Sequence, residues 1–298
     1  MAGLKRLAGL RPVPADWYYR GVLTARSGAA GHLQLRYLGT AGFVLSDARR
    51  TVVLDPYLSR PGAMRSLAAR LIPDTALIRR VIPHADEVLI GHAHHDHILD
   101  APDLCLQTGA RLIGSRSTMM VGHAAGLPDR QLRETAGNED IACGDWSVHG
   151  LPSRHGRLMG RIPFPGDITA PPPWPPRMRH LRHGLVLNWI VRTGGLTVAH
   201  IDSADFINEQ LDGHRCDVLC LCAIGRKARP HYVRDAVQRL RPRWVVPCHW
   251  DTMLTPLHAE PDQIPGVDLP GFMEEIRQAG AEPLLTPMLG DLYFPCQY

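Results

Sequence analysis

The sequence predicts an α/β fold in which two mixed β-sheets are covered by helices. Three observations support this prediction. Short apolar runs rich in Val, Ile and Leu recur along the chain, and helix-like stretches are interspersed between them. The length of 298 residues is enough for one large domain with a substantial core. Apolar residues make up 45% and charged residues 21% of the chain, as is ordinary for a globular protein.

The predicted strands follow one another with short connections. In the first half of the chain they cover residues 33–39, 43–46, 51–55, 87–91 and 111–115. In the second half they cover residues 146–152, 185–192, 196–202, 217–222 and 243–249. Thr193, Gly194 and Gly195 predict a hairpin between the strands 185–192 and 196–202. Two helices are expected at 231–240 and 271–280, the second of which ends in glycine.

We expect residues 1–32 to form an N-terminal extension and residues 33–298 to form one domain. Residues 160–184 stand apart as a Pro-rich loop, because seven prolines exclude a helix or a central strand. A loop of this length inside a compact domain is uncommon, and it is often a lid or a binding loop. A disordered surface insertion is the alternative.

The composition bears on whether the chain binds nucleic acid, spans a membrane or forms disulfides. A net charge of +4, from 33 basic and 29 acidic residues, is too mild to indicate nucleic-acid binding by itself. The chain contains no apolar stretch near the roughly 20 residues of a membrane span. Cys216, Cys220 and Cys222 lie in an apolar run, which favours a buried strand over a disulfide and indicates a cytoplasmic setting. We expect a small-molecule substrate; homo-oligomerisation stays open.

A cluster of metal-ligating side chains follows directly on the strand 87–91. It consists of His92, His94, Asp96 and His97. Imidazoles packed together repel one another when protonated, and a carboxylate buried beside them needs a cation. A divalent metal supplies that cation, and imidazole and carboxylate are ligands of catalytic zinc. A surface histidine patch, in a chain with 16 histidines, is the alternative.

The pattern H-x-H-x-D-H after an apolar strand resembles the metallo-β-lactamase fold superfamily, over residues of about 33 to 290. Further likeness lies in residues 38–59, 144–156, 197–205 and 223–252. Within the superfamily, the chain resembles the branch of ascorbate-6-phosphate lactonase and the N-acyl-phosphatidylethanolamine-hydrolysing phospholipase D. Asp55-Pro56, the turn at 223–225 and the segment 249–252 carry that likeness. The resemblance implies a four-layer αββα sandwich of two mixed sheets flanked by helices.

The resemblance also implies a complete set of ligands for two metal ions. One ion would be held by His92, His94 and His155, and the other by Asp96, His97 and His249. Asp202 would bridge the two ions. Related proteins usually present Gly-Asp-Thr where this chain has Ile201-Asp202-Ser203, so Asp205 is an alternative to Asp202. Asp55 would orient a histidine ligand, and its alternative role is that of a turn residue.

The function that the resemblance implies is a dinuclear metal-dependent hydrolase. A hydroxide between two divalent ions, zinc in the first place and manganese or iron otherwise, would attack a phosphodiester, a lactone or a related ester. Asp96 would orient this hydroxide as well as bind metal. The acid that protonates the leaving group stays open among His200, His231, Lys227 and the metals.

Basic residues near the predicted site indicate an anionic substrate. Arg154 and Arg157 flank His155, and Lys227 and His231 are further candidates for substrate binding. A solvated basic face is the alternative. The competing function is an iron-dependent oxidoreductase on the same fold, similar to persulfide dioxygenases. Those enzymes use a single iron and do not need the second ligand set.

Overall fold

The computed structural model describes residues 10–21, 31–47 and 49–295. Residues 1–9 and 22–30 of the expected N-terminal extension therefore lie outside the described residues. Of the remainder, β1 (Arg11–Pro12) pairs with β14 (Asp262–Gln263), and η1 (Ala15–Trp17) follows β1. The backbone N–H of Tyr19 donates to the carbonyl of Leu285 at 2.7 Å. The described part of the extension thus packs on the domain.

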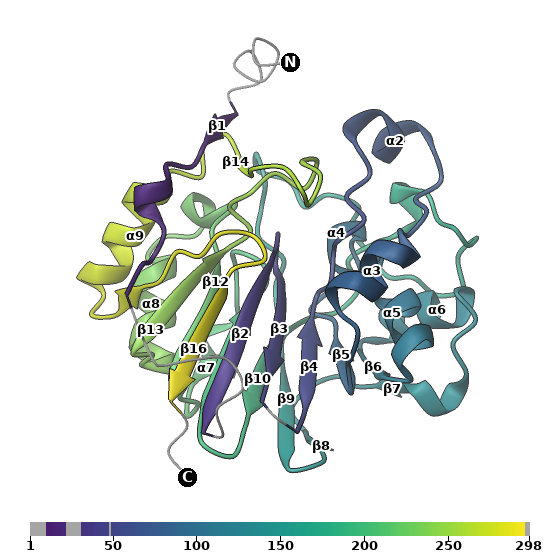
Figure 1. Cartoon of the computed structure of the whole chain (residues 1–298), viewed down its shortest axis with the longest axis horizontal. Helices are drawn as coiled ribbons and strands as arrows, with labels where there is room; N and C mark the ends of the chain where they lie inside the picture. Colours follow the sequence, from purple (N-terminus) through teal and green to yellow (C-terminus); the bar gives the residue numbers. More distant parts are fainter. Residues whose placement is uncertain (1–9, 22–30, 48, 296–298) are drawn as a thin grey trace.

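Two mixed β-sheets form the centre of the molecule, with seven strands each in the described residues (Figure 1). The first sheet has the order β16-β2-β3-β4-β5-β6-β7 and consists of β2 (His32–Gly39), β3 (Gly42–Ser46), β4 (Thr51–Leu54), β5 (Glu87–Leu89), β6 (Arg111–Gly114), β7 (Leu132–Glu134) and β16 (Asp291–Pro295). The second has the order β15-β13-β12-β11-β10-β9-β8 and consists of β8 (Asp140–Cys143), β9 (Trp146–Ser153), β10 (Val186–Arg192), β11 (Thr197–Ile201), β12 (Val218–Cys222), β13 (Trp244–Cys248) and β15 (Glu282–Pro283).

Each sheet has an antiparallel part and a parallel part, which confirms the prediction of mixed sheets. In the first sheet β16, β2, β3 and β4 pair antiparallel, and β4 to β7 pair parallel. In the second sheet β8 to β11 pair antiparallel, and β11, β12, β13 and β15 pair parallel. The predicted hairpin is also confirmed, since β10 and β11 pair antiparallel with Trp189 opposite His200.

Helices cover the outer faces of both sheets. The helices of the described residues are α2 (Ala63–Ala68), α3 (Thr75–Val81), α4 (His95–Ile98), α5 (Ala101–Thr108), α6 (Arg116–Ala124), α7 (Asn208–Leu211), α8 (Tyr232–Leu240) and α9 (Leu269–Gln278). In Figure 1, α3, α5 and α6 lie on one side of the paired sheets, and α8 and α9 lie on the other. The four-layer αββα sandwich is therefore confirmed.

The alternation of side chains along a strand divides the core into two parts. Val52 and Leu54 of β4 belong to the large core between the sheets, which extends to α8 and α9. Val53 between them belongs to the second core, under α3, α5 and α6. Successive side chains of a strand point to opposite faces, so apolar residues at every position are expected in a sheet covered on both sides. Cys220 and Cys222 in β12 are buried free thiols, as predicted.

Short helices were harder to predict than strands. Helices α3, α5 and α6 were not expected, because segments of seven to nine residues show little periodicity. Their ends carry local signals, such as the Asp74 carboxylate that accepts the Leu77 N–H at the start of α3. Helix α9 begins two residues before its predicted start, because Asp268 caps it by accepting the N–H of Gly271.

The Pro-rich loop 160–184 packs against the body of the domain, so the alternative of a disordered insertion does not describe it. Its only helical turn among the described residues is η3 (Met178–His180). The Pro176 carbonyl accepts the Leu71 N–H at 2.7 Å, and the His183 carbonyl accepts the Ala93 N–H at 2.9 Å. These two bonds attach the loop to the segment after α2 and to the turn after β5.

A fully buried ion pair joins Arg60 to Asp251, with 2.9 Å between Nη1 and Oδ2. Asp251 also accepts the Thr40 N–H at 2.8 Å and the Tyr37 hydroxyl. Burial opposes ionisation of Asp251, but Arg60 and these hydrogen bonds keep its pKa below the usual value of 3.8. The pair therefore fixes the turn after β13 against β2, and this turn begins with His249.

No helix among the described residues is long and apolar enough to cross a bilayer.

We predict that Arg60→Met lowers the free energy of unfolding by about 3–5 kcal/mol, because it leaves the Asp251 carboxylate buried without a cation. Urea denaturation followed by circular dichroism measures the change. Arg36→Met is the matched control: Arg36 pairs with Asp291 at 2.7 Å but is 35% exposed, so its loss costs about 0–1 kcal/mol.

We also predict that the stabilisation by the Arg60–Asp251 pair depends on pH. A depressed carboxylate pKa stabilises the fold at pH values above 3.8 and ceases to do so as the pH falls through the folded-state pKa. The gap in melting temperature between the wild type and Arg60→Met should therefore narrow as the pH falls below 4. A gap that stays constant down to pH 3 would show that the ion pair is not its cause.

Candidate metal centre

The H-x-H-x-D-H motif begins in the turn after β5 with His92 and His94 and continues into α4 with Asp96 and His97. His92, His94, Asp96 and His97 are each no more than 6% exposed. Three other strands end at the same place: Asp202 directly follows β11, His249 directly follows β13, and His155 lies two residues beyond β9. Since β9, β11 and β13 run in the same direction, their carboxyl ends meet at one edge of the second sheet.

The structure brings all seven sequence-predicted ligands together. Three groups have ligand atoms within 4.8 Å of one another and could each hold an ion: His92, His94 and His155; His92, His97 and Asp202; and Asp96, His97 and His249. His92 and His97 each belong to two groups. The arrangement is therefore one continuous cluster rather than three separate sites.

Short distances link the members of this cluster. His92 Nδ1 lies 2.6 Å from Asp202 Oδ2, and His92 Nε2 lies 3.0 Å from His94 Nδ1. Asp96 Oδ2 lies 3.2 Å from His249 Nε2 and 3.8 Å from His97 Nε2. Each carboxylate thus faces ring nitrogens, as it would in a metal centre.

The donor set fits a divalent cation. His94 Nε2, Asp202 Oδ1 and His249 Nδ1 are buried and have no hydrogen-bond partner, which is costly unless an ion satisfies them. Burial and the neighbouring imidazoles lower the pKa of His94 to about 4 and that of His97 well below its usual value. Neutral imidazole is the form that binds metal.

Asp96 is ionised in this environment. Its burial alone would raise the pKa, but His97, His95 and the hydrogen bond from His249 together hold the pKa well below the usual value. A carboxylate that keeps its charge at neutral pH is both a metal ligand and a proton acceptor.

Asp55 lies behind the cluster, where one oxygen is 3.0 Å from His97 Nδ1 and the other accepts the Gly91 N–H at 2.7 Å. Burial, and then the nearby Asp202, raise the pKa of Asp55 well above its usual value. Asp55 and His249 have positive φ angles of 43° and 52°. Such angles are uncommon for non-glycine residues and occur most often at functional sites.

Two residues of the site were missed by sequence reasoning. Gly91 has no room for a side chain, because a Cβ there would lie 2.1 Å from Asp202 Oδ2. The ring of His183 lies 5.8 Å from those of His94 and His155. A glycine just before the histidine motif was a usable signal, whereas nothing local marks His183 within the Pro-rich loop.

Asp205, the alternative to Asp202, lies outside the cluster. Its carboxylate pairs with Arg229 at 2.6 Å. His200, a candidate for the leaving-group acid, is fully buried in β11 and does not line the pocket over the cluster. Asp202 is therefore the aspartate that the structure places against His92.

A cavity of about 210 Å³ opens over the cluster. Its walls are apolar side chains from several segments: Leu158, Pro163, Phe164, Met178, Ile224 and Met253. The Phe164 ring, from the Pro-rich loop, lies 6.5 Å from that of His94. Among the described residues, no arginine or lysine lines this cavity.

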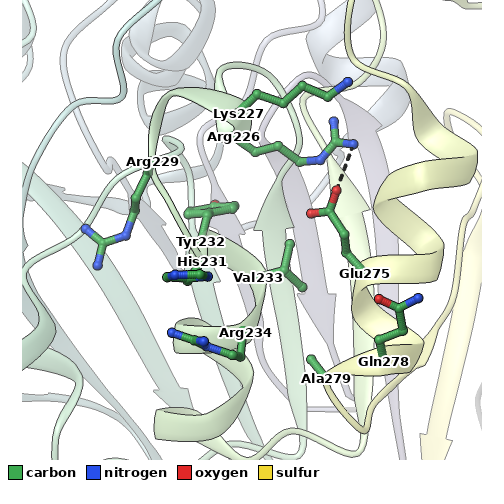
Figure 2. A pocket seen from close by; sticks show the side chains of 10 residues that line it. All are labelled: Arg226, Lys227, Arg229, His231, Tyr232, Val233, Arg234, Glu275, Gln278 and Ala279. Atoms are coloured by element: carbon green, nitrogen blue, oxygen red, sulfur yellow. Dashed lines mark hydrogen bonds and ion pairs between the residues drawn. The ribbon is translucent and has the colours of Figure 1, made fainter.

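The four candidate substrate-binding residues lie elsewhere. Arg154 and Arg157 line a neighbouring hollow that shares His155 with the cavity. Lys227 and His231 line a separate pocket of about 410 Å³ between α8 and α9 (Figure 2), where Lys227 pairs with Asp268 at 3.3 Å. None of the four lines the cavity over the cluster, so their role in substrate binding stays a prediction.

Comparison with known proteins agrees with this architecture. The Beta-lactamase superfamily domain matches residues 34–249. A UPF0173 metal-dependent hydrolase of Anaeromyxobacter dehalogenans (strain 2CP-1) is 31% identical over 234 residues, covering 75% of this chain and 77% of that protein.

Solved structures share the fold. Igni18, a metallo hydrolase from Ignicoccus hospitalis, has a TM-score of 0.57 at 20% identity and covers 89% of this chain and 100% of its own. CmlA, a diiron β-hydroxylase from Streptomyces venezuelae, has a TM-score of 0.57 at 15% identity, over 91% of this chain and 55% of its own. The domain match and the relative above 30% identity together show that the chain belongs to the metallo-β-lactamase superfamily of metal-dependent hydrolases.

Proposed function

We propose that this chain uses two divalent metal ions to hydrolyse an ester or lactone with an apolar body. The observation that supports this most is the convergence of seven ligands, six of them buried and His155 half-buried. His92, His94 and His155 would hold one ion, and Asp96, His97 and His249 the other, with Asp202 between them. Asp55 would orient His97 through the contact at Nδ1, which leaves Nε2 for the metal.

The donor chemistry suits zinc first, since imidazole and carboxylate are its usual catalytic ligands; manganese and iron also accept them. When bound, a pair of divalent ions lowers the pKa of water and stabilises negative charge on a carbonyl or phosphoryl oxygen.

The protein's own residues support attack by water rather than by a side chain. Cys222 lines the cavity, but burial raises the pKa of its thiol well above the usual value, so it stays protonated and weakly nucleophilic. The Ser203 hydroxyl accepts the Gly156 N–H at 2.9 Å, a backbone contact that does not activate it. Ionised Asp96, at the floor of the cavity, is placed to orient a water and accept its proton.

The cavity walls favour a substrate with an apolar body. Leu158, Phe164 and Met178 would contact that body, while its ester group would face the histidines. Because the described lining of the cavity contains no arginine or lysine, it does not support the expected preference for an anionic substrate. A lactone or carboxylic ester therefore fits better than a phosphodiester.

An iron-dependent oxidoreductase is the competing function on this fold. Asp96, His97 and His249 supply a second ligand set that a single-iron dioxygenase does not need. Metal analysis with a visible spectrum separates the two. A colourless protein with two zinc or manganese ions supports hydrolysis, and bound iron with a chromophore contradicts it.

We predict that His97→Ala reduces bound metal from two ions to one or none. The same substitution should lower kcat/KM by about 100-fold or more, because stabilisation of the developing oxyanion is lost. The assay compares lactones, nitrophenyl esters and bis-p-nitrophenyl phosphate. His149→Ala is the control, since His149 lies in β9 and its side chain contacts Asp140 and His214, which lie outside the metal cluster. Full activity of His97→Ala would contradict the two-metal proposal.

Removal of the metal is expected to lower the melting temperature by about 5–10 °C, because buried ligands left without a cation lose both hydration and charge compensation. Differential scanning calorimetry of the chelated and the zinc-reloaded protein measures this. If complete chelation leaves the melting temperature unchanged, the seven residues do not hold a tightly bound ion.

Gly91→Ala should weaken metal binding by about 10–100-fold while the fold is retained, because the new Cβ displaces the Asp202 carboxylate. Competition with a chromogenic chelator measures the affinity. Gly62→Ala is the matched control, since a Cβ at Gly62 meets nothing within 4 Å. Equal affinity of Gly91→Ala and the wild type would argue against Asp202 as a ligand.

A further inference from the structure

Two segments beside the metal cavity carry an unusual charge. Residues 61–84 and 154–184 contain ten arginines and two aspartates, a net charge of +8. The rest of the chain has 23 basic and 27 acidic residues, so it is net negative although the whole chain carries +4. All ten arginines are exposed. The positive charge of this protein is therefore concentrated on two segments.

The same segments carry the most exposed apolar side chains of the described residues. Met159 is 96% exposed, Met64 86%, Leu67 81% and Ile72 69%. Among the other large apolar side chains of the described residues, the most exposed is Leu106, at 49%. Met64 and Leu67 are three residues apart in α2 and so share one face of that helix. Exposed apolar side chains and arginines thus occur together in these two segments.

The two segments are joined to each other and to the cavity. Arg70 donates to the Pro175 carbonyl at 2.9 Å, and Arg177 donates to the Ala68 carbonyl at 2.9 Å. Leu158 and Met178 of the second segment line the cavity. Helix α2 projects from the body of the molecule at the upper edge of Figure 1. The two segments therefore meet at residues 68–70 and 175–177, and the second of them reaches the cavity. We call the exposed side chains of the two segments the arginine-rich surface.

The arginines of this surface are not used to stabilise the fold through ion pairs. In the described parts of the chain, the arginines that pair with carboxylates belong to other segments: Arg36, Arg49, Arg50, Arg60, Arg111, Arg133, Arg192, Arg226, Arg229, Arg234, Arg239 and Arg277. Arg70 and Arg177 donate to backbone carbonyls, but among the described residues no carboxylate pairs with any of the ten, so their positive charge is available to an anionic partner.

We propose that the arginine-rich surface docks onto an anionic lipid bilayer. Cationic side chains are attracted to the surface potential of anionic lipids, and single apolar side chains between them enter the boundary of the acyl chains. An arginine side chain can place its guanidinium group among the headgroups while its aliphatic part lies against the apolar boundary. A nucleic acid would use the arginines but would give no advantage to exposed Met64, Leu67 and Met159.

Docking would bring the cavity close to the lipid. If the protein is the hydrolase proposed above, a cavity with apolar walls beside a bilayer would bind an amphiphilic ester that leaves the lipid surface. This step rests on the proposed function, whereas docking itself does not, because none of the seven ligands belongs to the exposed residues of the surface.

The test is co-sedimentation of the full chain with vesicles of phosphatidylcholine alone or with one third phosphatidylglycerol. We expect at least tenfold stronger partition onto the anionic vesicles, and weaker partition as salt rises, because salt screens the attraction. Absence of binding to the anionic vesicles at low salt, or equal binding to both kinds, would overturn the proposal.

Two variants separate the contribution of the apolar side chains from that of the arginines. Met64→Ser with Leu67→Ser removes apolar tips, and the combination of Arg65→Gln, Arg79→Gln, Arg80→Gln and Arg179→Gln removes charge. Each should weaken partition at least tenfold. The matched controls, Leu106→Ser with Leu289→Ser and Arg116→Gln with Arg130→Gln, Arg215→Gln and Arg241→Gln, change exposed residues elsewhere and should bind as the wild type does.

The outcomes separate docking from hydrolysis. If only the charge variant loses binding, the surface recognises a polyanion such as nucleic acid or an acidic protein, and the lipid proposal is wrong. Metal-free protein should bind vesicles as the wild type does. Vesicle binding without any ester hydrolysis would reject the proposed function alone, and hydrolysis of a soluble ester without vesicle binding would reject docking alone.

Discussion

The structure depends on one constraint: seven polar side chains share a buried space where the two sheets meet. Buried imidazoles and carboxylates are unfavourable without compensation, and hydrogen bonds within the protein do not satisfy all of them. Burial lowers the pKa of His94 and of His97, and the neighbouring histidines lower the pKa of Asp96. The fold therefore maintains ligands in the protonation states that a cation requires, at a cost to its own stability.

Two sets of contacts hold the metal ligands in position. The Arg60–Asp251 pair holds the turn that begins with His249, and Asp55 contacts both His97 and the backbone of Gly91. Positive φ angles at Asp55 and His249 show that the backbone is held away from its preferred conformations here. Rigid neighbours are needed to maintain such angles, and the buried ion pair provides one of them.

The sequence predicted the strands of the two sheets and the metal ligands better than it predicted the residues that surround the ligands. Strand periodicity and the histidine motif are local signals, and the order of His155, Asp202 and His249 became meaningful through the family resemblance. The roles of His183 and Arg60 depend on contacts with residues far along the chain, so no local pattern marks them, whereas Gly91 could have been noticed from its place just before the histidine motif. Lys227 and His231 lie between α8 and α9 and not in the cavity, so their role in substrate binding stays a prediction.

The walls of the cavity and its floor come from different parts of the chain. Strand ends and the turn after β5 supply the ligands, whereas Leu158, Phe164 and Met178 come from the segment around the Pro-rich loop. Loops accept substitutions and changes of length more readily than strands do. Selection can therefore alter which molecules such an enzyme accepts while leaving its chemistry intact, so relatives with the same ligands can diverge in substrate through this one loop.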